Sequence, residues 1–227
     1  RIKTEKNLDV QPSTPIVVYR ESIKRQSVEM EGKSPNKHNK FYIIVEPLDE
    51  GIYQSIKSGE IPEIRIKKKD QSIVDILRKF GLDAKAALGY VNFFKGNVLV
   101  NEVRGEVHIG EVLDMIMDAF EEVMSEGPLA REPGTRVKVR LIDIKLHEDA
   151  IHRGPAQVLP AVREAIKLAM LNAQAVMYEP MQILQIESPS HFLGELSKLI
   201  QNKRGQLLNV EQEGEHITVK AKLPVAE

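Results

Sequence analysis

The stretch Leu146-His147-Glu148-Asp149-Ala150-Ile151-His152-Arg153-Gly154-Pro155-Ala156-Gln157 decides how this chain is organised. It joins an alternating apolar pattern over 135–146, which predicts a strand, to apolar residues at helical spacing from about 159 to 174. The turn between them contains two histidines, two carboxylates and an arginine. Because rigid scaffolds place functional residues on loops, we interpret this strand-to-helix turn as a functional tip.

A zinc site is the first alternative for this turn. His147 and His152 resemble the H-E-x-x-H motif, in which a spacing of four puts both imidazoles on one helical face. The spacing here is five, which turns the second ring roughly 140° away at ~100° per residue. No third ligand follows nearby, the next histidine being His191, and a catalytic zinc needs three protein ligands. We therefore expect no bound metal. A hydrolase that uses His147, Asp149 and His152 is a much weaker interpretation than a binding tip.

Three motifs in the same order carry a resemblance to a known family. They are the turn quoted above, the loop Ser34-Pro35-Asn36-Lys37-His38-Asn39-Lys40-Phe41-Tyr42, and the segment Gly127-Pro128-Leu129-Ala130-Arg131-Glu132-Pro133. The first resembles the diphthamide loop of archaeal and eukaryotic translation elongation factor 2, the ribosomal translocase. The other two resemble further signatures of that family, and the matches continue to residue 227. On charge alone, the second motif is a solvated turn.

The resemblance implies a set of site residues and partners. His152 matches the histidine that is converted to diphthamide, which makes diphthamide-synthesis enzymes expected partners. The tip would contact the ribosome, namely decoding-site rRNA of the small subunit, tRNA and mRNA, through Asn36, Lys37, His38, Asn39, Lys40, Asp149, Arg153 and Gly154. Cationic side chains would neutralise phosphate, and histidines and asparagines would hydrogen-bond or stack on irregular RNA. We further expect Ile151 to anchor inward and Gly154 to adopt positive φ.

The sequence predicts an α+β fold in two parts. The resemblance implies the end of a preceding domain over 1–22, a fourth domain like ribosomal protein S5 domain 2 over 23–175, and a partial ferredoxin-like βαββ domain over 176–227. Periodicity alone predicts strands at 15–20, 62–69, 181–186, 206–212 and 216–223, a hairpin over 28–45, and helices at 70–80, 109–124 and 191–203.

Two local features of the pattern around the tip give sharper predictions. Within 135–146, the apolar residues fall on odd positions up to Leu141 and on even positions from Ile142 onward. One extra residue at this point would keep both sets on the same face, which predicts a β-bulge that changes the direction of the strand end. Pro160 is tolerated only in the first turn of a helix, so the following helix is predicted to begin near Leu159.

Composition limits the classes of function. Opposite charges nearly balance to a net charge of −1 over 227 residues, so any RNA contact must come from a local patch. The absence of cysteine excludes disulfides and thiolate chemistry, and it fits the cytoplasm. No apolar run approaches the ~20 residues that span a bilayer. Residue 1 is not methionine, so we expect a piece of a longer protein.

No phosphate-binding motif of the G-x-x-x-x-G-K-[ST] or G-x-G-x-x-G type occurs in the sequence. We therefore expect this chain to bind no cofactor and to catalyse no reaction, with GTP and Mg²⁺ held by a domain outside it in the full-length family. A ribosome-binding GTPase relative without the diphthamide modification is the remaining alternative.

Overall fold

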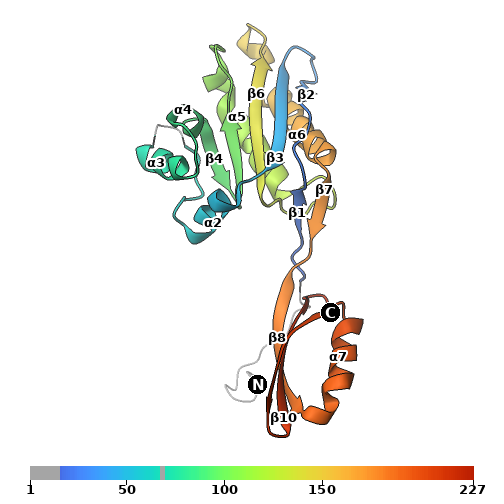
Figure 1. Ribbon diagram of the computed structural model, residues 1–227. Helices are drawn as coiled ribbons and strands as arrows, with labels where there is room; N and C mark the ends of the chain where they lie inside the picture. The colour runs from blue at the N-terminus through green and yellow to red at the C-terminus, as the bar shows by residue number, and fades with distance from the viewer. Residues whose placement is uncertain (1–15, 67–69) are drawn as a thin grey trace, which may run out of the picture. The chain divides into compact units, whose positions relative to one another are not determined.

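The computed structural model describes residues 16–66 and 70–227, and it divides into two compact units (Figure 1). The larger unit comprises Tyr19–Tyr178, and the smaller contains Glu179–Glu227. Both mix helices and strands, so the α+β class is confirmed at that level. The predicted domain boundaries and the two fold names remain predictions.

A five-stranded mixed sheet is the scaffold of the larger unit. Its order is β2 (Met30–Lys33), β3 (Lys40–Pro47), β6 (Val137–Lys145), β5 (Asn97–Asn101) and β4 (Tyr90–Phe94). The pair β5–β6 is parallel, and the other neighbours are antiparallel. The end of β6 therefore lies at the same edge of the sheet as the start of β3.

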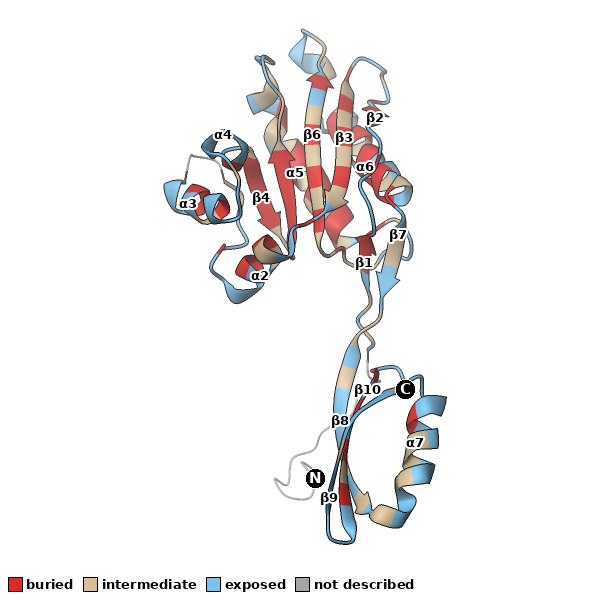
Figure 2. Cartoon of the chain, viewed as in Figure 1, coloured by how far each residue is buried: buried red, intermediate tan, exposed pale blue. Residues whose placement is uncertain are grey.

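Two long helices cover one face of this sheet. α5 (Ile109–Ser125) and α6 (Pro155–Asn172) pack on the inward residues of β3 and β6 in one apolar cluster. Shorter helices α2 (Glu50–Ser58), α3 (Gln71–Lys79) and α4 (Ala84–Ala87) form a second cluster with β4 and β5. Along β3 and β6, buried residues alternate with partly exposed ones (Figure 2). The outward face of β2, β3 and β6 is thus left accessible.

The elements around the tip follow the predictions with one exception. Pairing passes from Tyr42↔Asp143 to Ile43↔Leu141, so Ile142 is the extra residue and the predicted bulge is confirmed. The predicted start of the second helix near 159 is wrong, because α6 begins at Pro155. Proline at the first helical position needs no amide partner, and the helix also accommodates Pro160 by forgoing one hydrogen bond.

Two predicted strands differ in the structure. The strand expected at 15–20 is instead β1 (Arg20–Ile23), because its partner β7 (Ala175–Tyr178) pairs only with these four residues. Of the strand expected at 62–69, the described residues 62–66 contain an isolated bridge between Arg65 and Asn92 in place of a regular strand. Residues 67–69 of that basic run, like residue 15, lie outside the described residues. The hairpin and the helices predicted at 70–80 and 109–124 are confirmed.

The segment 127–133 binds a buried carboxylate. Glu21 on β1 is fully buried, and its carboxylate accepts hydrogen bonds from the backbone N–H groups of Leu129, Ala130 and Glu132 at 2.8, 2.8 and 3.1 Å. Successive backbone N–H groups of this kind form an anion-binding concavity. The third sequence motif is therefore, in this structure, a structural clamp on β1.

The smaller unit has the predicted element order. β8 (Met181–Pro189) leads through a short 3-10 turn to α7 (Leu193–Asn202), then β9 (Gln206–Glu213) and β10 (His216–Pro224). The sheet order is β8-β10-β9 with both pairs antiparallel, so β10 lies between the two strands that α7 connects. This is a split β-α-β arrangement, with Ile200 of α7 packed in a small apolar cluster with Val219.

We predict that Gly32→Ala destabilises the larger unit. A Cβ at Gly32 on β2 would lie 2.1 Å from the Ala161 carbonyl oxygen and 2.8 Å from Ala165 Cβ on α6. Because neither backbone can move without disturbing the core, overpacking should cost about 1–3 kcal/mol of unfolding free energy. Denaturant unfolding of the purified chain measures this.

Gly110→Ala is the matched control for that measurement. Gly110 lies in the first turn of α5, and an added Cβ there meets nothing within 4 Å. This change should be neutral or stabilise the chain by up to about 1 kcal/mol through reduced entropy of the unfolded chain. Equal unfolding midpoints for the two variants would contradict the close approach of β2 and α6.

Candidate nucleic-acid interface

Two loops distant in the sequence meet at one end of the five-stranded sheet, and we call this end the tip. Residues 34–39 connect β2 to β3, and residues 146–154 connect β6 to α6 (Figure 1). The loops are neighbours because Lys40 at the start of β3 pairs with Lys145 at the end of β6. The structure thus brings together the two segments that contain the predicted site residues.

Three imidazole rings contact one another at the tip. The ring centroids of His38 and His147 are 4.8 Å apart, those of His38 and His152 are 4.9 Å apart, and those of His147 and His152 are 4.5 Å apart. His38 is exposed, and the other two are partly exposed. Sequence reasoning placed His38 at the tip but did not predict this cluster, because its members come from different loops.

Hydrogen bonds from two asparagines join the two loops. Asn39 is fully buried, and its Nδ2 donates to the His152 carbonyl at 2.7 Å while its Oδ1 accepts from the His147 amide at 3.1 Å. Asn36 Nδ2 donates to the same His152 carbonyl at 3.3 Å, and the Asn36 amide donates to Gln157 Oε1 at 2.9 Å. The backbone of His152 is therefore held while its ring stays partly open to solvent.

Arg153 supports the tip from within and does not face solvent. Its side chain is only 5% exposed. It donates to the carbonyls of His147 and Glu148, and through Nε and Nη2 to Glu111 Oε2 on α5 at 3.1 and 2.6 Å. His108 and then Arg153 hold the pKa of Glu111 below its ordinary value. In this structure, then, Arg153 lacks the free position that a phosphate contact needs, and Asn39 is likewise an internal support.

Two further expectations about the turn are wrong. Ile151 is 78% exposed, so the inward anchor predicted for it is wrong. Gly154 has φ −71° as the N-cap of α6, so the predicted positive φ is also wrong. The turn is instead shaped by Asp149, whose Oδ1 accepts from the Ile151 amide at 3.1 Å at the start of the short 3-10 helix Ala150–His152. Asp149 itself is exposed.

The predicted lysines occupy two different environments. Lys37 is exposed at the apex of its loop, in the left-handed region with φ 63°. Lys40 lies at the base of the loop, where its Nζ is 3.1 Å from Glu31 Oε2. Hydrogen bonds from Lys33, Lys40 and Tyr42 lower the pKa of Glu31 to about 2. Lys37 is thus the cation of the predicted set that projects most freely.

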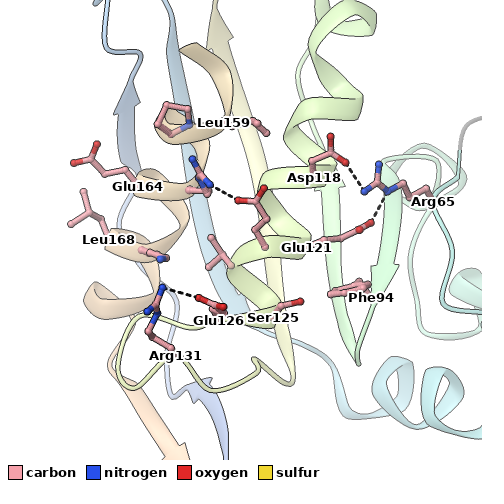
Figure 3. A pocket seen from close by; sticks show the side chains of 15 residues that line it. Arg65, Phe94, Asp118, Glu121, Ser125, Glu126, Arg131, Leu159, Glu164 and Leu168 are labelled. Carbon is pink, nitrogen blue, oxygen red and sulfur yellow. Dashed lines mark hydrogen bonds and ion pairs between the residues drawn. The ribbon is translucent and has the colours of Figure 1, made fainter. Parts of the chain in front are cut away.

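Two other kinds of site, a metal centre and a surface hollow, are relevant to the described residues. Among residues 16–66 and 70–227, no group of three or more histidine, aspartate or glutamate side chains is arranged to hold a metal ion. An open hollow of about 1000 Å³ lies between α5 and α6 (Figure 3). Its arginines are already paired: Arg65 with Asp118 and Glu121, Arg131 with Glu126, and Arg163 with Glu122.

Comparisons with known proteins agree with this architecture. The profile of the family described as "Elongation factor G, domain IV" matches residues 59–174, and that of "Elongation factor G C-terminus" matches residues 176–227. Proteins named Elongation factor 2 from Thermococcus onnurineus, Thermococcus kodakarensis and Methanocaldococcus jannaschii are 49%, 48% and 49% identical to this chain. Each alignment covers all of the chain and 31% of the relative.

The profiles and the fold define part of a translation elongation factor. More narrowly, the chain belongs to the family of elongation factors G and 2, with its archaeal relatives named Elongation factor 2. It spans about a third of the length of those relatives. In the described part of the chain, no helix is both long and apolar enough to cross a membrane.

We predict that Asn39→Ala loosens the tip without unfolding the sheet. The change removes one of two amide donors to the His152 carbonyl and leaves the His147 amide without its acceptor. An unsatisfied buried polar group costs about 1–3 kcal/mol. Hydrogen exchange measured by mass spectrometry should therefore increase over residues 146–154. Asn209→Ala, on an exposed position of β9, is the control and should leave this exchange unchanged.

Proposed function

We propose that this chain is the ribosome-facing part of a GTP-dependent translocase. Its tip would enter the decoding site of the small subunit and promote movement of tRNA and mRNA, while GTP hydrolysis would take place in a part of the factor outside this chain. The observation that carries the proposal is the pair of loops that present three imidazoles and Lys37 on a backbone held by buried Asn39. Family membership supports a role in translation elongation. We therefore propose that the protein acts in the cytoplasm.

The chemistry of the tip suits irregular RNA. Imidazole rings can stack on unpaired bases and hydrogen-bond to their edges, and the exposed Lys37 can neutralise a phosphate. The loops are joined to each other through Asn36 and Asn39 and to α5 through Arg153, so little ordering entropy would be lost on binding. Asp149, being exposed beside the rings, would orient the contact by repelling misplaced phosphates.

We further propose that His152 is the diphthamide residue and that the synthesis enzymes are partners of this loop. Its carbonyl is fixed by two amide donors, so the ring would be presented reproducibly to a modifying enzyme. The ring of His147 is engaged differently, because its Nδ1 accepts from the Asp149 amide at 3.0 Å. Exposed Ile151 and open space around Gly154 leave room for an enzyme at this turn.

Mass spectrometry of the peptide spanning residues 146–163 tests this assignment. The complete factor purified from an archaeal host should carry the adduct on His152, whereas material from a bacterial host should carry plain histidine. His147→Gln should keep the adduct, and His152→Gln should lose it. An unmodified His152 in factor from a competent host would favour a relative without the modification, and an adduct on His147 would overturn the choice of residue.

Translocation by the full-length factor tests the role of the tip. Replacing Lys37 and His38 together by glutamine removes the freest cation and one ring, while buried Asn39 stays in place. We expect translocation to slow roughly fivefold, the approximate worth of one phosphate contact at 0.1 M salt, with unchanged GTP hydrolysis. Lys57→Gln, at an exposed position of α2, is the control. An unaffected translocation rate in the double variant would count against the tip.

A further inference from the structure

The accessible face of the sheet carries a row of three lysines next to the tip. Lys33 on β2 pairs with Lys40 on β3, and Lys40 pairs with Lys145 on β6. Paired residues on neighbouring strands project from the same face, with strands about 4.8 Å apart. Like charges placed directly opposite one another destabilise a sheet. Without a counter-charge beside it, the row would therefore cost stability.

The next row along the strands fixes these lysines in place. Glu31 Oε1 lies 2.9 Å from Lys33 Nζ, and Glu31 Oε2 lies 3.1 Å from Lys40 Nζ and accepts from the Tyr42 hydroxyl at 3.0 Å. Lys145 Nζ lies 5.7 Å from the centroid of the Tyr42 ring, at a distance typical of a cation–π contact. One carboxylate and one ring thus organise all three ammonium groups.

Charge remains on this face after the internal pairing. The second row also contains Asp143, which is exposed and whose Oδ1 accepts from the Ile144 amide. Three lysines face two carboxylates, so the two rows carry a net charge of +1 in a chain whose net charge is −1. The side chains of Lys33 and Lys40 are 56% and 36% exposed, which leaves ammonium donors for an anion.

The row is continuous with the tip through the chain itself. β2 and β3 run from Lys33 and Lys40 directly into the loop that presents His38, and β6 runs from Lys145 towards His147. The accessible strand face therefore adjoins the two loops of the tip, which follow directly on the ends of these strands (Figure 2). An extended polyanion that touches the tip can continue over the sheet without a break.

We propose that Lys33, Lys40 and Lys145 form a phosphate-binding row for a single-stranded RNA backbone. Glu31 holds Lys33 and Lys40 side by side, Tyr42 holds Lys145 beside them, and the RNA would continue from the row to the rings of the tip. The proposal rests on the proposed function in one respect, that RNA is the partner of the tip. RNA suits the row because lysines recognise phosphate as point charges, and a backbone contact of this kind carries no base sequence.

Binding of a fluorescein-labelled oligouridylate to the full chain tests the row. Lys33→Gln with Lys145→Gln should weaken binding roughly 25-fold at 0.1 M salt and reduce the slope of log affinity against log salt by about 1.4, because each single-strand contact contributes about 0.7. Lys57→Gln with Lys85→Gln removes the same charge from exposed positions on α2 and α4 and should change neither. Far-ultraviolet circular dichroism should confirm equal folding of all variants.

The Lys37→Gln/His38→Gln variant separates this proposal from the function of the tip. Loss of affinity and slope in the row variant supports the row whatever the tip variant does. If only the tip variant loses affinity, the row is overturned and the tip stands. Equal loss in the row variant and its charge-matched control would also overturn it, as would failure of the unaltered chain to bind the RNA at low salt. Stronger competition by polyglutamate than by unlabelled oligouridylate would assign the row to an acidic protein segment instead.

Discussion

The geometry of the tip depends on the side chain of Asn39. This one amide is buried between two loops and satisfies the His152 carbonyl on one side and the His147 amide on the other. The partners lie 108 and 113 residues away in the chain. Because buried polar groups must be paired, the two loops can approach only in the register that completes these bonds. The contacts among the three imidazoles depend on that register.

The sheet brings the loops within reach of Asn39. The parallel pair β5–β6 and the antiparallel pair β3–β6 set the end of β6 beside the start of β3, and the bulge at Ile142 changes which face the last residues of β6 present. Arg153 then ties the turn to α5 through Glu111. Since removing one partner from a buried charged contact is costly, this support holds the turn firmly against the helical layer.

The two faces of the same strands serve different purposes. The inward residues of β3 and β6 stabilise the unit by packing on α5 and α6. The outward residues near the tip bring three lysines together, two of them paired with Glu31, whose pKa is lowered to about 2 by Lys33, Lys40 and Tyr42. This carboxylate is charged throughout the neutral range, so its ion pairs with Lys33 and Lys40 persist there. The strand period of two makes this separation possible.

Local patterns in the sequence determined most of the secondary structure, the position of the tip and the bulge at Ile142. These features depend on side-chain periodicity and on turn-forming residues, both of which a segment of a few residues is enough to reveal. Only the tertiary structure decided that Arg153 and Asn39 are internal supports, that Ile151 is exposed, and that three histidines touch. Burial and long-range pairing depend on residues more than a hundred positions away, and a local pattern does not encode which strand becomes the neighbour.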